Sequence, residues 1–303
     1  HLETADMVRD NPDIAHICAI DRKWKKRGVG VQIKQESAIA SGIHAQHYDA
    51  VIDISGNWRG AWITLFSGAP IRISYDYTEK PKWLWQLCHN RVVERGTVEM
   101  PMVEDNLQLL EPLGIRFDRS FNPVCMGVSE QTKTALEGKL REKGWQGEKY
   151  VVAHPGSRWF FKCWDNEKNA EILQRLLDNG HNIVLTASPD EREREMIDYL
   201  VQYLTVPPQA KLWVLSGCLN LRELAAAIRG AELFFGVDSV PMHMAAAFGI
   251  PQVALFGPSW VNRWRPYSDK AIVIWAGDYG NLPHPDSIDT SDQTRLLNAI
   301  PVD

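Results

Sequence analysis

Two segments of this chain combine residue types and a position that suit a phosphate-binding site. In residues 235–247, an apolar run ends at Asp238 and Ser239, and Pro241 then opens a predicted helix. A buried strand that leads directly into a helix presents unpaired backbone N–H groups and the positive end of the helix dipole. A nucleotide diphosphate is well suited to such a place. The alternative is an ordinary strand–turn–helix junction in which Asp238 or Ser239 is only an N-cap.

The second segment, residues 154–164, follows another predicted strand. It contains Gly156 and Ser157, which can offer backbone and hydroxyl donors, and it carries the cations Arg158 and Lys162. Two cations at the carboxyl end of a parallel strand suit a diphosphate, particularly one that gains charge as a leaving group. The alternative is a surface loop whose cations are merely solvated.

Two further side chains lie close to these segments in the sequence. His243 comes one helical turn after Ser239, where it can hydrogen-bond a phosphate or a ribose, or else pack as a core histidine. Cys163 follows Lys162 and can be read as a thiol of lowered pKa. Because no general base accompanies Cys163, a packed cysteine is the favoured interpretation.

A basic, tryptophan-containing run occupies residues 21–27, just after a predicted strand. Its cations are Arg22, Lys23, Lys25, Lys26 and Arg27. At a strand's carboxyl end this run is expected to grip a phosphorylated or carboxylated acceptor, and Asn57 and Arg59 occupy the equivalent place after the next strand. The alternative is a solvated basic turn.

Composition narrows the function classes. The chain has 303 residues, of which 45% are hydrophobic and 23% charged, so it is globular, and its net charge of −5 argues against nucleic-acid binding. Nicotinamide, P-loop and Asp-x-Asp motifs are absent, and the five cysteines form no C-x-x-C pair. We therefore expect no cofactor, no metal and a reducing cytosol. No apolar run approaches the roughly 18 residues of a spanning helix.

Short apolar runs alternate with helical patterns, which is typical of βαβ units and parallel sheets. The expected strands are residues 16–20, 48–55, 71–75, 150–154, 182–187, 211–215, 232–237 and 252–256. Asp190 and Asn220 are predicted N-caps. We predict an α/β chain of two Rossmann-like domains, 1–146 and 147–303, that face each other across a central cleft. The chain begins without the strand and glycine-containing turn that open such a domain, so we expect the first βα unit and the last helix to be missing.

Three sets of residues together resemble glycosyltransferase family 9, the ADP-heptose:lipopolysaccharide heptosyltransferases. The sets are Phe-Phe-Lys-Cys-Trp-Asp-Asn at 160–166, Gly-Val-Asp-Ser at 236–239 with His-Met-Ala-Ala-Ala at 243–247, and Trp-Arg-Pro at 264–266 with Trp-Ala-Gly at 275–277. The resemblance covers essentially the whole chain and is strongest after residue 150. It implies the GT-B fold and transfer of L-glycero-D-manno-heptose from ADP-heptose to a heptose of the lipopolysaccharide inner core, inverting and without a metal.

The resemblance also implies roles for individual residues. Lys162 matches the family lysine that meets the donor diphosphate and helps ADP to leave. Gly236, Asp238 and Ser239 match the donor-binding strand end, and His243 matches the histidine of the following helix. The basic run at 22–27 resembles the place where related enzymes hold the anionic acceptor. The family's general base, an aspartate in the first βα turn, is expected in the missing N-terminal segment.

The partners implied are ADP-heptose, the inner-core acceptor and the cytoplasmic face of the inner membrane, to which a cytoplasmic enzyme of this kind would attach peripherally. Two alternatives stay open: a non-catalytic GT-B-like binding protein, and a family 9 transferase with another donor sugar.

Overall fold

The computed structural model describes residues 2–118, 124–291 and 293–303, and the chain forms two compact units. Unit 1 comprises the described residues of His1–Ala5 and Ala15–Phe121, and unit 2 comprises those of Asp6–Ile14 and Asn122–Asp303. The sequence placed the boundary after residue 146. Helix α5 (Glu130–Glu142) instead belongs to unit 2, because its Leu136 and Leu140 are buried in the same core as helix α8 (Leu221–Arg229).

Unit 2 is built on a six-stranded parallel sheet with the strand order β6-β5-β4-β7-β8-β9. The strands are β4 (Val151–His154), β5 (Ile183–Leu185), β6 (Leu212–Val214), β7 (Leu233–Val237), β8 (Gln252–Phe256) and β9 (Ala271–Trp275). Residues of β4 and β5 are buried throughout, as expected for a parallel sheet covered on both faces. The predicted α/β class with parallel sheets is confirmed.

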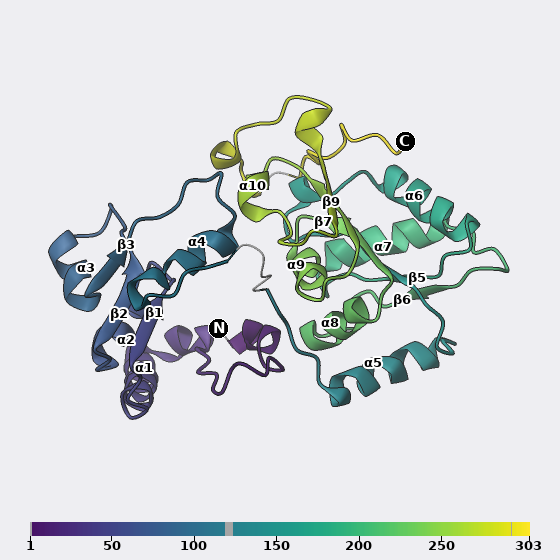
Figure 1. Ribbon diagram of the computed structural model, residues 1–303. Coiled ribbons are helices and arrows are strands. Elements are labelled where there is room, and N and C mark those ends of the chain that lie inside the picture. Colours follow the sequence, from purple (N-terminus) through teal and green to yellow (C-terminus); the bar gives the residue numbers. More distant parts are fainter. Residues whose placement is uncertain (1, 119–123, 292) are drawn as a thin grey trace. The chain divides into compact units, whose positions relative to one another are not determined.

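Helices cover both faces of this sheet (Figure 1). One core contains side chains of α5, α8 and α9 (Val240–Ala247), and the other contains side chains of α6 (Asn166–Asp178) and α7 (Glu191–Tyr203). A short helix, α10 (Val261–Trp264), follows β8. Both predicted N-caps are confirmed: Asp190 accepts from the backbone N–H of Arg192, and Asn220 forms a capping box with Glu223.

Unit 1 contains a three-stranded parallel sheet in the order β1-β2-β3. Its strands are β1 (Ala50–Asp53), β2 (Ile71–Tyr75) and β3 (Arg91–Val93), and its helices are α1 (Val29–His44), α2 (Trp58–Phe66), α3 (Lys82–Cys88) and α4 (Met102–Gln108). At the end of β1 the buried Asp53 accepts hydrogen bonds from Ser55 and contacts His89 Nε2 at 3.2 Å. This contact ties β1 to the end of α3.

The prediction of a strand at residues 16–20 is wrong. These residues have no ladder partner among the described residues, and the carbonyl of Ile20 accepts one backbone hydrogen bond, from Leu2. A strand requires a neighbour that pairs its N–H and C=O groups, and an apolar run alone does not supply one. The sequence also missed α1, β3 and β9.

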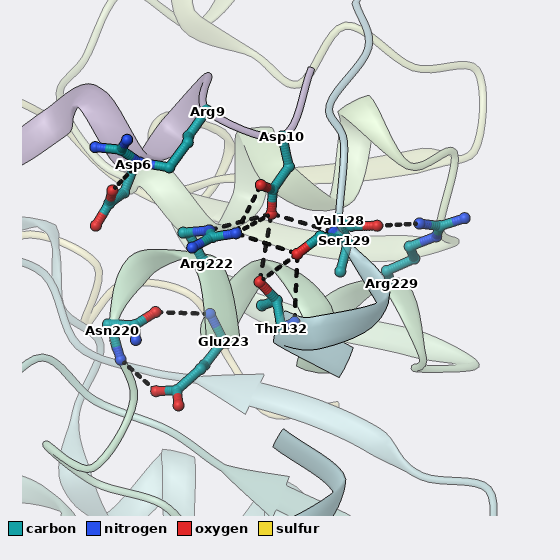
Figure 2. Close-up of polar contacts among 10 residues, drawn as sticks. All are labelled: Asp6, Arg9, Asp10, Val128, Ser129, Thr132, Asn220, Arg222, Glu223 and Arg229. Atoms are coloured by element: carbon teal, nitrogen blue, oxygen red, sulfur yellow. Dashed lines mark hydrogen bonds and ion pairs between the residues drawn. The ribbon is translucent and has the colours of Figure 1, made fainter. Parts of the chain in front are cut away.

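The segment Asp6–Ile14 is fastened to unit 2 by Asp10 (Figure 2). Arg222 of α8 donates to both carboxylate oxygens of Asp10, with Nη2–Oδ1 at 2.6 Å and Nε–Oδ2 at 3.1 Å, and the backbone N–H of Ser129 donates to Oδ2. A Cβ at Gly127 would overlap the Asp10 carbonyl oxygen, so only glycine allows this approach. The segment is therefore held by the two-pronged ion pair between Arg222 and Asp10 and by the close backbone contact between Gly127 and Asp10.

None of the helices in the described residues is both long and apolar enough to cross a membrane.

Candidate active site

The strand order of unit 2 places a topological switch point between β4 and β7. These two strands are parallel neighbours, with His154 of β4 opposite Gly236 of β7, but β5 and β8 continue the sheet in opposite directions. In open α/β sheets, ligands bind outside the carboxyl ends of the strands at such a point. A Cβ at Gly236 would lie 2.7 Å from the His154 carbonyl oxygen, so the glycine permits the close approach of the two strand ends.

Lys162 and Asp238, which follow β4 and β7, meet at this point. Lys162 Nζ lies 2.6 Å from Asp238 Oδ2, and the two side chains are only 13% and 7% exposed. The hydroxyl of Ser259, from the loop after β8, donates to the same Oδ2 at 2.6 Å. Three consecutive strands of the sheet therefore contribute one cation, one carboxylate and one hydroxyl to a single cluster.

The aromatic ring of Trp159 lies under the Lys162 ammonium. Lys162 Nζ is 5.0 Å from the ring centroid, within the range of a cation–π contact. Trp159 is itself 39% exposed and stacks against Phe161. Between them, Asp238 and Trp159 hold the ammonium at the sheet edge, whereas Arg158 is exposed to solvent.

Helix α9 starts beside this cluster with Ser239 in the N-cap position. The Ser239 side chain makes no capping hydrogen bond to the helix and instead donates to the Val237 carbonyl at 3.2 Å. Ser239 is thus the N-cap residue by position, but its side chain does not cap the helix. Its hydroxyl leaves the N–H groups of the first turn without a side-chain cap, which is the condition under which a helix N-terminus receives an anion.

His243, one turn into α9, belongs to the same electrostatic cluster. Burial lowers the pKa of His243 below its usual value, the Asp238 carboxylate opposes this shift, and the Lys162 ammonium adds to it. The imidazole is therefore neutral at physiological pH and can donate or accept a hydrogen bond.

A second buried group supports the turn after β4. His154 Nδ1 lies 2.9 Å from Thr186 Oγ1, and burial lowers the pKa of His154 to about 4, so this ring is neutral. Glu193 of α7 accepts a backbone hydrogen bond from Ser188 and packs against Gly156, where a Cβ would lie 2.6 Å from its Oε2. Ser157 is buried in this turn. The conformation of this turn is thus fixed by the packing of Gly156 against the Glu193 side chain.

Cys163 is a packed residue. It is fully buried, and burial raises the pKa of its thiol to about 12. The thiolate is therefore not formed at neutral pH, and the favoured structural interpretation of this cysteine is supported.

The residues expected to bind the acceptor belong to unit 1 and are not gathered in one place by any described contact. The basic run forms the 3-10 helix Arg22–Arg27, in which Lys23 and Lys26 are exposed, and the side chains of Arg22 and Lys25 lie outside the described residues. Asn57 is the N-cap of α2, accepting from Gly60, and Arg59 pairs with Glu36 at 2.9 Å. Asn57 and Arg59 are thus engaged in structural contacts.

Sequence reasoning missed Ser259 and Glu193. Ser259 stands in the segment Gly-Pro-Ser-Trp after β8, and a turn serine carries no distinguishing pattern. The signal available was its position, since β8 is the next strand outward from β7. Glu193 lies on a highly charged helix and is distinguishable from its neighbours only by its burial.

The cluster can bind a diphosphate and stabilise it as it leaves. One ammonium and an uncapped helix N-terminus present positive charge, and the neutral His243 adds a hydrogen-bonding group. The described residues contain no group of three or more His, Cys, Asp or Glu side chains arranged to hold a metal ion.

Comparisons with known proteins agree with this arrangement. The family profile described as Glycosyltransferase family 9 (heptosyltransferase) matches residues 37–294. The chain is 32% identical to an Escherichia coli lipopolysaccharide heptosyltransferase 3 over 99% of this chain and 85% of that protein. It is 25% identical to lipopolysaccharide heptosyltransferase 2 of E. coli strain K12, over 89% of this chain and 80% of the relative.

Solved structures share the fold. The glycosyl transferase family 9 protein from Veillonella parvula matches with a TM-score of 0.78 and 23% identity over 92% of this chain and 76% of that chain. The E. coli ADP-heptose lipopolysaccharide heptosyltransferase II matches with a TM-score of 0.63 and 25% identity, over 80% of this chain and 73% of that chain. The GT-B fold expected from the sequence is thereby confirmed.

Proposed function

Because the chain belongs to glycosyltransferase family 9, the heptosyltransferases, we propose that it transfers L-glycero-D-manno-heptose from ADP-heptose to a heptose of the lipopolysaccharide inner core. The observation that carries this proposal is the cluster of Lys162, Asp238 and Ser259 at the switch point of unit 2, beside the start of α9. The Lys162 ammonium and the uncapped start of α9 are the groups that suit the diphosphate of a nucleotide sugar.

In the proposed reaction, an acceptor hydroxyl attacks the anomeric carbon of the donor heptose. The bond between that carbon and the diphosphate oxygen breaks, and ADP departs with one more negative charge. Lys162 and the N–H groups at the start of α9 stabilise this charge, which makes their interaction stronger in the transition state than in the ground state. Asp238 holds the ammonium of Lys162 in place before the donor arrives.

A general base must take the proton of the attacking hydroxyl. Asp238 is poorly suited to this role, because its Oδ2 already accepts from both Lys162 and Ser259. His154 is also unsuitable, since it is buried and hydrogen-bonded to Thr186. We assign the base to neither of them.

The transfer is proposed to invert the anomeric configuration and to proceed without a metal. A single displacement by the acceptor hydroxyl inverts the carbon that it attacks. The positive charge that a metal would supply at the diphosphate is available from Lys162 and the α9 N-terminus. Activity that survives EDTA, and an anomeric linkage opposite to that of the donor, are the expected results; loss of activity on chelation that manganese or magnesium restores would refute the metal-free assignment.

We further propose that the protein attaches peripherally to the cytoplasmic face of the inner membrane, where the acceptor would be presented. The exposed cations Lys23 and Lys26 on the helix Arg22–Arg27 support this, because basic segments are attracted to anionic lipid surfaces.

Calorimetry with a panel of nucleotides tests the donor. ADP-heptose is expected to bind more tightly than UDP- or GDP-sugars, and ADP is expected to compete with it. Preference for another nucleotide sugar would instead indicate a family 9 transferase with a different donor. Tight binding of ADP-heptose without transfer to any heptose-containing acceptor would favour the binding-protein alternative.

A further inference from the structure

The ammonium group of Lys162 is in contact with both a carboxylate and an aromatic ring. Its Nζ lies 2.6 Å from Asp238 Oδ2 and 5.0 Å from the centroid of the Trp159 ring. An ammonium carries three N–H donors. The carboxylate accepts from one of them and the face of the ring attracts another, and within the described residues Nζ makes no further hydrogen bond. One donor direction therefore remains for a ligand, and Trp159 helps to set it.

The place of the Trp159 ring beside Lys162 follows from the backbone between them. Residues Phe160–Lys162 form a 3-10 helix, and the backbone N–H of Lys162 donates to the Trp159 carbonyl at 2.9 Å. A 3-10 helix has three residues in each turn, so side chains three positions apart lie above one another. Trp159 and Lys162 have this spacing. The turn itself therefore brings the ring to the ammonium.

Other side chains anchor this turn. Phe161 is buried, and the Phe160 ring has the guanidinium groups of Arg192 and Arg295 at 5.2 Å and 5.6 Å from its centroid. The Trp159 ring stacks on Phe161 with an interplanar angle of 12° and remains 39% exposed. The turn is thus anchored through its two phenylalanines, and a change of the Trp159 ring leaves those anchors in place.

The ring contact restricts an ammonium that is otherwise able to pivot. Lysine carries its charge on a flexible four-carbon stem, and Asp238 holds that charge through one oxygen only. A second contact, with the ring, removes much of this freedom. Tryptophan has the most attractive face of the aromatic side chains, and the attraction grows as water is excluded. Because the Lys162 side chain is only 13% exposed, little water competes for its charge.

We propose that Trp159 is a positioning residue for heptose transfer, which holds the Lys162 ammonium in the orientation in which it meets the departing diphosphate. This inference rests on the proposed function, because it assigns a residue to that reaction. Trp159 acts through Lys162 and has no need to touch the donor. Its effect depends on the electron density of the ring face, which is of no consequence for a purely structural side chain.

Fluorinated tryptophans placed at position 159 alone test this role. Trp159→Leu, which removes the ring, is expected to lower kcat by about fivefold. Fluorine withdraws electron density from the ring face and changes the ring's size little, so kcat should fall stepwise with one, two and three fluorines. The thermal midpoint should stay the same throughout the series.

Trp62 is the matched control for the fluorine series. It is also 39% exposed and stacked on a phenylalanine, Phe66, but unlike Trp58 it has no cation over its ring in the ranges that the structure describes. Fluorination of Trp62 should leave kcat unchanged. A kcat that ignores fluorine at position 159, or that responds equally at both positions, would overturn the proposal.

A double-variant cycle shows whether the ring acts through the ammonium. In the Lys162→Met protein, Trp159→Leu should cause no further loss of kcat, because the cation that the ring positions is already gone. A ring that contacts the donor directly would lower kcat in either background. Additive losses would therefore contradict the positioning role.

Calorimetry with ADP separates this inference from the proposed function. ADP carries the diphosphate but requires no transfer, so its affinity reports on the ammonium without the reaction. That affinity should fall with fluorination at position 159 and should not respond to it in Lys162→Met. If this result is found but no heptose is transferred from ADP-heptose, only the transferase proposal fails. If heptose is transferred and neither kcat nor ADP affinity responds to fluorine, only the positioning role fails.

Discussion

Replacing Lys162 by methionine should damage both turnover and stability, and the two effects can be separated. Lys162 is the only cation in contact with Asp238 in the part of the chain that the structure describes. Methionine keeps most of the side-chain volume and removes the charge. The loss of one donor that strengthens as the leaving group gains charge is typically about 2.7–4 kcal/mol of barrier, or roughly 10²–10³ in kcat.

The stability effect arises from the carboxylate that is left behind. Asp238 is 7% exposed at its side chain and keeps one donor, Ser259, when Lys162 is removed. Breaking a fully buried pair costs about 3–5 kcal/mol, whereas leaving one buried group partly unsatisfied costs about 1–3 kcal/mol. Because Ser259 remains, we expect the free energy of unfolding to fall by the smaller amount.

The assay combines steady-state kinetics at saturating ADP-heptose with urea unfolding. Adding Asp238→Asn to Lys162→Met should recover most of the stability, since no charge is then buried, but should not recover kcat. Lys168→Met is the matched control, because Lys168 Nζ donates to the Asn298 and Ile300 carbonyls and to no carboxylate. Unchanged kcat in Lys162→Met would refute the leaving-group role. Failure of the double variant to regain stability would refute the reasoning about the orphaned carboxylate.

Three further predictions follow from other contacts. Ser259→Ala should lower kcat about tenfold by loosening Asp238, with donor KM little changed, and Ser259→Thr should restore kcat; equal loss in both variants would show that the hydroxyl is not responsible. The pKa of His154 is lowered from 6.5 to about 4 by burial, so between these values the unfolded state binds more protons and stability falls as pH falls, by up to about 3 kcal/mol. His154→Gln should flatten that pH dependence in urea titrations from pH 7 to pH 4, and an unchanged slope would contradict the assignment. Gly127→Ala should destabilise unit 2 by at least about 1 kcal/mol, because its methyl group would displace the segment Asp6–Ile14, and an unaltered thermal midpoint would show that the segment is not held there.

The second half of the fold followed from local signals in the sequence. Strands β4 to β8 are predominantly apolar runs, and helices α7 and α8 begin at Asp190 and Asn220, which cap them through contacts only two or three residues long. Such patterns can be recognised from a few neighbouring residues alone.

In unit 1, local patterns of this kind did not predict the structure. The apolar residues of helix α1 do not form a stripe along one face from which a helix could be predicted, and none of its 16 residues is buried. Residues 16–20 have the apolar composition of a strand but find no ladder. In both cases the outcome depends on neighbours that a local pattern does not specify.

The sequence identified residues of the candidate site, but it did not predict which of them contact one another. Lys162 and Asp238 were both identified, yet their ion pair joins positions 76 residues apart, and only the pairing of β4 with β7 brings them together. Ser259 joins them from β8, which a turn serine does not reveal.

The central claim is that this protein moves a heptose from ADP-heptose with the help of Lys162. Mass spectrometry of an inner-core oligosaccharide after incubation with the protein and ADP-heptose tests it most directly. We expect the gain of one heptose residue, greatly slowed by Lys162→Met and unaffected by Lys168→Met. No gain with ADP-heptose, or a gain that proceeds equally well in Lys162→Met, would contradict it.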